Sequence, residues 1–188
     1  MEYIILSVYF ILFVAIVVKC RFFIFKTFPR KYVLILFLIK IFSATIFLWI
    51  YTFHYPQGLD SETTFQSSVK LYQISKNDPH LFIRLMGFSD NDEQTLQAGI
   101  QLNKSWFKDY EQNFINENRT VIRFHALLNF FSCHFYKVHL LMLCFFVFCG
   151  SFFLYHFFQP QTKKEDFLCV FACFLIPSTL FWTSGVLK

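Results

Sequence analysis

The fold is decided by residues 32–55, which read YVLILFLIKIFSATIFLWIYTFHY and contain one lysine, Lys40. A helix of about 20 apolar residues spans the hydrocarbon core of a bilayer. Trp49, Tyr51 and Tyr55 stand where an aromatic belt at the outer end would be. A charge as deep as Lys40 is costly unless it snorkels or faces protein, so we expect it to do one of these, with a functional role as the alternative. The stretch predicts a membrane-spanning helix.

Three further apolar segments lie at residues 3–18, 138–158 and 167–182. The whole chain is 56% hydrophobic and only 15% charged, whereas a soluble domain has roughly a quarter of its residues charged. The first segment has neither the preceding basic region nor the following small-residue site of a cleaved signal peptide, so we interpret it as a span. The sequence therefore predicts an all-α, polytopic transmembrane helical protein with about four spans.

The charges predict the orientation of these spans. Residues 19–31 carry five cations and no acid, and Lys163 and Lys164 follow the third apolar segment, so both places are predicted to be cytoplasmic. The region between Pro56 and Asn118 is acidic and is predicted to be external. Because the cations flank apolar segments instead of forming one patch, the net charge of +5 does not indicate a nucleic-acid partner. The predicted parts are two N-terminal spans in residues 1–55, an external loop at 56–137 and two further spans in 138–188.

The external loop is too long to be without structure. Leucine, isoleucine and phenylalanine recur at near-helical spacing in residues 63–74 and 95–106, which predicts short helices on the outer membrane surface. Residues 120–137 are amphipathic and end in aromatic side chains, which predicts a helix that enters the membrane obliquely. The six cysteines fall mostly within apolar stretches, where packing is favoured over a disulfide or metal framework.

Two carboxylates, Asp60 and Glu62, follow a turn formed by Pro56 and Gly58 at the predicted membrane boundary. A carboxylate there can hold a divalent cation or act as a general base. The alternative is that Asp60 or Ser61 caps a helix starting near Glu62.

Arg119 and Arg123 are four residues apart and therefore share a helical face. Two guanidinium groups at the outer surface suit a phosphate, which they bind through paired hydrogen bonds. Contact with lipid headgroups or pairing with the acidic loop are the alternatives.

The final stretch, residues 177–188, reads PSTLFWTSGVLK. Pro177 breaks a helix and frees backbone carbonyls, and small polar residues and Lys188 follow at the predicted outer face. Such a broken end can bind an anion. The alternative is an ordinary helix terminus with Trp182 at the interface.

Three patterns together resemble bacterial polytopic membrane glycosyltransferases of the GT-C type and related polysaccharide polymerases, which use polyprenyl-linked sugars. The patterns are the Gly-x-Asp turn at 58–60, N-E-N-R-x-x-x-R at 116–123 and P-S-x-x-F-W-T-S-G-x-x-K at 177–188, of which the last is the most specific. The resemblance covers most of residues 45–188.

The resemblance implies sugar transfer from a polyprenyl-phosphate donor at the outer face of the bacterial inner membrane. It implies that Asp60, with Glu62 as a nearby alternate, activates the acceptor or binds a divalent cation. The residues that it assigns to the lipid-linked phosphate are Arg119, Arg123 and Lys188, and those of the closing motif are Pro177, Ser178, Trp182, Ser184 and Gly185.

The chain departs from this family in two ways: the acidic loop follows the second span instead of the first, and the family has more spans. We therefore expect an N-terminal part that is inactive alone and needs a partner chain or a C-terminal continuation. A non-catalytic membrane subunit of an envelope-assembly or transport complex, or a fragment of a polysaccharide polymerase, are the other interpretations.

Overall fold

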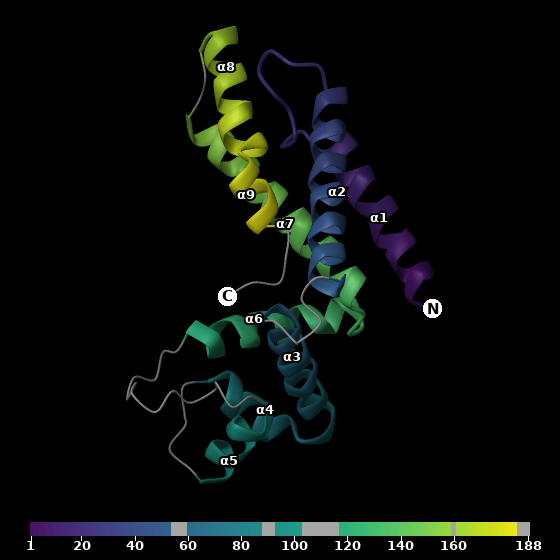
Figure 1. Cartoon of the computed structure of the whole chain (residues 1–188), viewed down its shortest axis with the longest axis vertical. Coiled ribbons are helices and arrows are strands. Elements are labelled where there is room, and N and C mark those ends of the chain that lie inside the picture. The colour runs from purple at the N-terminus through teal and green to yellow at the C-terminus, as the bar shows by residue number, and fades with distance from the viewer. Residues whose placement is uncertain (54–59, 88–92, 103–116, 159–160, 184–188) are drawn as a thin grey trace. The chain divides into compact units, whose positions relative to one another are not determined.

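The structure is a computed structural model that describes residues 1–53, 60–87, 93–102, 117–158 and 161–183 (Figure 1). Throughout these ranges the regular structure is helical, and none of it is a strand. The chain divides into two compact units. Unit 1 comprises residues 1–56 and 137–185, and unit 2 comprises residues 57–136 with 186–188.

Unit 1 contains three long helices: α1 (Glu2–Lys19), α2 (Lys31–Phe53) and α7 (Tyr136–Phe158). Among the described residues these three are long and apolar enough to cross a membrane, α2 through its part Lys31–Ile50. They coincide with the predicted spans at residues 3–18, 32–55 and 138–158, so these three helices are confirmed as long apolar elements.

The fourth predicted span, residues 167–182, is not one continuous α-helix. It is divided among α8 (Lys163–Val170), the π-helix η2 (Phe171–Leu175) and α9 (Pro177–Trp182), which follow one another in Figure 1. The break comes before Pro177, where Ile176 has an extended ψ of 118°. Proline lacks an N–H and its ring disfavours the helical conformation of the preceding residue, which is why the helix stops there. A membrane crossing by this segment stays a prediction.

Phenylalanine side chains hold unit 1 together, including the basic segment 19–31. Phe23 and Phe25 of that segment are buried. The Phe25 ring stacks on Phe152 of α7 at 5.0 Å between centroids, and Phe152 meets Phe174 of η2 edge-on at 4.9 Å. The Arg30 guanidinium also donates to the carbonyl oxygen of Val18 at 2.8 Å, which covers the end of α1. The predicted cytoplasmic turn is thus a packed part of the unit.

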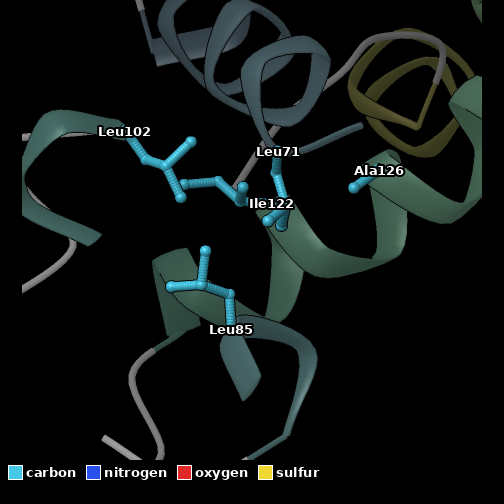
Figure 2. Close-up of a cluster of buried hydrophobic side chains, with 5 residues drawn as sticks. All are labelled: Leu71, Leu85, Leu102, Ile122 and Ala126. Atoms are coloured by element: carbon cyan, nitrogen blue, oxygen red, sulfur yellow. The ribbon is translucent and has the colours of Figure 1, made fainter. Parts of the chain in front are cut away.

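Unit 2 contains α3 (Asp60–Asn77), α4 (Pro79–Met86), α5 (Glu93–Leu102) and α6 (Glu117–Ser132). Each contributes to one apolar cluster, in which the side chains gather toward a common centre (Figure 2): Leu71, Leu85, Leu102, Ile122 and Ala126. The helices of the polar region therefore bury their apolar faces against one another. Their predicted place on the outer membrane surface stays a prediction.

The helix boundaries of unit 2 differ from those predicted. The helix predicted at 63–74 is the longer α3, and the one predicted at 95–106 is described as far as Leu102. The predicted helix at 120–137 is wrong as one element, because α6 ends at Ser132. Cys133 and His134 have φ values of 51° and 57°, in the left-handed region, and so separate α6 from α7. The sequence analysis missed α4, which Asp78 caps by accepting from the Leu81 N–H at 3.0 Å.

Candidate functional site

Asp60 and Glu62 lie in the first turn of α3. The helix begins at Asp60, two residues earlier than the capping alternative predicts, and the Glu62 side chain is exposed. The Asp60 side chain lies outside the described residues. Within the described parts of the chain, no group of three or more His, Cys, Asp or Glu side chains is arranged to hold a metal ion. The catalytic and metal-binding roles of the two carboxylates stay predictions.

Arg119 and Arg123 are buried in unit 2. Their predicted place at the outer surface of the membrane stays a prediction. Arg123 donates from Nε to the Leu85 carbonyl at 2.7 Å and from a terminal nitrogen to the Gly87 carbonyl at 2.8 Å. These carbonyls lie at the end of α4, where helical hydrogen-bond partners run out and a cation is favourable. Arg123 thus joins α6 to α4. The phosphate-binding role of both arginines stays a prediction.

The closing motif is described only in part. Pro177 and Ser178 begin α9 and Trp182 ends it, whereas Ser184, Gly185 and Lys188 lie outside the described residues. The predicted helix break at Pro177 is confirmed.

The end of α9 is held by Lys40 of α2, which is only 5% exposed. Its Nζ donates to the Leu180 carbonyl at 3.0 Å and to the Thr183 Oγ1 at 2.5 Å, and the Ser43 hydroxyl donates to the same carbonyl at 3.2 Å. The expectation that Lys40 faces protein is confirmed. Its partners could not be read from the sequence, because about 140 residues separate them from Lys40.

An apolar groove of about 510 Å³ lies between α1, α2 and α7 of unit 1. Its volume is within the roughly 300–1,000 Å³ of typical small-molecule sites. Four residues of each helix line it: Leu6, Ser7, Phe10 and Ile11; Ile41, Ala44, Thr45 and Leu48; Lys137, Leu140, Leu141 and Cys144. Ala44, Leu140 and Cys144 form its buried floor.

The two hydroxyl groups in the groove have partners within their own helices. Ser7 donates to the Tyr3 carbonyl and Thr45 to the Ile41 carbonyl, both at 2.8 Å. A ligand in this groove therefore meets hydrocarbon along most of its length. Such a wall suits a chain of methyl and methylene groups.

Lys137 is the one charged side chain among the residues that line the groove. It lies in the first turn of α7, and its Nζ donates to the Tyr3 hydroxyl at 3.0 Å while standing 4.6 Å from the centre of that ring. The Glu2 carboxylate is close enough to interact with it electrostatically. The groove thus combines an apolar trough with an ammonium group at one end, which suits an amphiphile with an anionic head.

This site was not predicted from the sequence. The amphipathic pattern of residues 120–137 places Lys137 at the end of a predicted helix, although a lone cation at the start of an apolar span is a signal for an interfacial contact. The groove itself has no sequence signal, because three separate helices form it.

No protein-family model, curated protein or solved structure matches this chain. The fold defines its class: in the described residues it is an all-helical protein with three helices fit to cross a membrane.

Proposed function

We propose that this chain is a membrane component of a GT-C-type glycosyltransferase, which transfers a sugar from a polyprenyl-phosphate-linked donor at the outer face of the membrane. The observation that carries the proposal is the groove between α1, α2 and α7 with the Lys137 ammonium at its end. An isoprenoid chain has no hydrogen-bonding groups and matches the apolar trough. Its phosphate is an acceptor for the lysine.

The resemblance of the closing motif and of the Asp60 turn supports the same reaction. In the proposed step the acceptor hydroxyl attacks the anomeric carbon of the sugar, and its proton passes to the Asp60 carboxylate. The bond between the anomeric carbon and the phosphate oxygen breaks, and polyprenyl phosphate leaves with the bonding electrons. Because Arg123 already donates to the two carbonyls at the end of α4, we assign the phosphate contact to Lys137.

Photocrosslinking tests the binding part of this proposal. The full chain is reconstituted in phosphatidylcholine vesicles and labelled with a polyprenyl phosphate that carries a photoreactive group near its phosphate. We expect labelled peptides from α1, α2 and α7. Ser7→Phe, which fills the groove, should reduce labelling, whereas Val8→Phe on the exposed neighbouring position of the same helix should not.

Lys137→Gln tests the phosphate contact. Loss of the ammonium removes a charge-assisted hydrogen bond to the phosphate, which water partly screens at this exposed position, so affinity for polyprenyl phosphate should fall severalfold. Affinity for the neutral polyprenol should not change. Lys19→Gln, at the other end of α1, removes the same charge away from the groove. Equal labelling of Ser7→Phe and Val8→Phe, or equal losses for the two lysine variants, would contradict the proposed site.

Sugar transfer from a polyprenyl-phosphate donor, measured in membranes containing the full chain and its partners, tests the reaction. Asp60→Asn should abolish transfer while the amount of membrane-inserted protein stays the same. Transfer at the original rate in that variant would remove Asp60 from the mechanism. Binding of the donor without any dependence of transfer on Asp60 would instead favour a non-catalytic membrane subunit.

A further inference from the structure

A second, open cavity of about 450 Å³ lies at the opposite end of α7 from Lys137. It is formed where the basic segment 19–31 meets the end of α7 and the residues before α8. The segment contributes Arg21 and Lys26, α7 contributes Tyr155 and His156, and Gln161 precedes α8. This cavity is therefore separate from the groove and does not depend on the proposed function.

The polar groups around the cavity are mostly hydrogen-bond donors. The Arg21 and Lys26 side chains are exposed. Lys26 Nζ donates to the Gln161 amide oxygen at 3.0 Å, a neutral partner that leaves the ammonium charge in place. The His156 Nε2 lies 2.8 Å from the Phe22 carbonyl oxygen, so this nitrogen carries a hydrogen. The mouth of the cavity thus presents a guanidinium and an ammonium group.

The nearest carboxylates are already held by other donors. Asp166 is fully buried and accepts from the Tyr155 hydroxyl at 2.5 Å and from the Thr27 N–H at 2.9 Å, as well as from the Thr27 hydroxyl. Glu165 accepts from the Gln161 N–H at 2.7 Å and from the Thr162 N–H at 3.2 Å. These backbone hydrogen bonds, with a smaller contribution from Lys26, lower the pKa of Glu165.

The buried Asp166 carboxylate also holds the residues that form the cavity in place. Tyr155 accepts from the Lys26 N–H at 2.9 Å while it donates to Asp166. Asp166 and Tyr155 together fix the two peptide groups on either side of the Lys26 α-carbon. The cationic side chains of the segment are thereby positioned against α7 and are not carried by a loose loop.

We propose that this cavity binds the phosphate of an anionic phospholipid headgroup. A guanidinium and an ammonium at one mouth suit a phosphate diester, and basic pockets between spanning helices bind anionic headgroups on the positively charged side of a membrane. Exposed apolar side chains favour a lipid over a free phosphate: Ile24 of the cavity lining is 41% exposed, and Phe153 and Phe157, on the same helix as Tyr155 and His156, are 66% and 77% exposed. They provide a surface for the acyl chains.

Thermal unfolding of the full chain in an uncharged detergent, with increasing phosphatidylglycerol, tests the proposal. We expect phosphatidylglycerol to raise the unfolding temperature and phosphatidylcholine to leave it nearly unchanged. Each cation near an anionic surface contributes about 1 kcal/mol, so Arg21→Gln combined with Lys26→Gln should weaken the apparent affinity roughly thirtyfold. The conservative Lys26→Arg should retain most of it.

The matched control is Lys163→Gln combined with Lys164→Gln. It removes the same charge from exposed positions at the start of α8, outside the cavity lining. An equal loss of affinity in this control would show diffuse attraction and overturn the cavity. An equal effect of phosphatidylcholine, or an equal rise with soluble glycerol 1-phosphate alone, would overturn the assignment to an anionic lipid. If the cavity variants unfold earlier without lipid, native mass spectrometry at low temperature measures the bound phosphatidylglycerol directly, and unchanged occupancy would refute the proposal.

Discussion

Replacing Asp166 by alanine should release the basic segment from α7 and α8. The carboxylate is fully buried and accepts hydrogen bonds from three donors: the Thr27 N–H, the Thr27 hydroxyl and the Tyr155 hydroxyl. A buried donor left without its partner costs about 1–3 kcal/mol. The two hydroxyl groups can rotate toward new partners whereas the N–H cannot, so we expect a total loss of about 3–4 kcal/mol.

Limited proteolysis with trypsin measures this loss of stability in the basic segment 19–31 directly. The segment contains Lys19, Arg21, Lys26, Arg30 and Lys31 as cleavage sites. If cleavage requires local opening, its rate follows the equilibrium population of the open form. A loss of about 3 kcal/mol should then accelerate cleavage on the order of a hundredfold. Trypsin cleavage in unit 2, at Lys70 and Lys76 of α3, should stay unchanged and serves as the internal reference.

Two further variants test whether Asp166 holds the basic segment. Tyr155→Phe removes one of the three donors to Asp166 and also the acceptor of the Lys26 N–H, but it leaves both Thr27 hydrogen bonds to Asp166 in place, so it should accelerate cleavage less than Asp166→Ala does. The double variant should show a combined effect smaller than the sum, because the two residues share a hydrogen bond. Unchanged cleavage in Asp166→Ala, or additive effects in the double variant, would refute the claim that this carboxylate holds the segment.

Three other predictions concern packing and buried charges within each unit. Leu85→Ala should destabilise unit 2 by about 2–5 kcal/mol because it opens a cavity in the apolar cluster. Ile83→Ala, at a position 66% exposed, should cost much less. Hydrogen exchange of α4 and α6 measures both losses, and equal losses would contradict the cluster. Burial lowers the pKa of His125 to about 4, so the unfolded chain binds more protons between pH 6.5 and 4 and unit 2 should lose up to about 3 kcal/mol as the pH falls through that range. His125→Gln should remove this part of the pH dependence, and an identical pH profile in that variant would contradict the assignment. Lys40→Met removes the ammonium that donates to the end of α9, so the rate of hydrogen exchange in α9 should rise while that in α1 stays the same. An unchanged exchange rate in α9 would show that Lys40 does not hold this helix.

The sequence predicted the three long apolar helices of the described residues because the signal for such a helix is local. In hydrocarbon a long apolar run such as residues 32–55 can satisfy its backbone hydrogen bonds within its own segment only by forming a helix. The break at Pro177 was predictable for the same reason, since proline acts on its immediate neighbours. The basic segment 19–31 was recognised by its charges, but these carry no information about its packing.

Only the tertiary structure decided what the polar and charged side chains contact. Lys40 meets Leu180, Arg123 meets the end of α4, and Asp166 holds Thr27 across 139 residues of sequence. The apolar residues of α3, α4, α5 and α6 cover one another in a shared cluster, whereas the periodicity of residues 63–74 and 95–106 predicted short helices on the outer membrane surface. Helical periodicity depends on neighbours three and four residues away, so the amino-acid sequence determined the long helices of this protein. The partner of a buried charge depends on which helices meet, and that is a property of the folded chain alone.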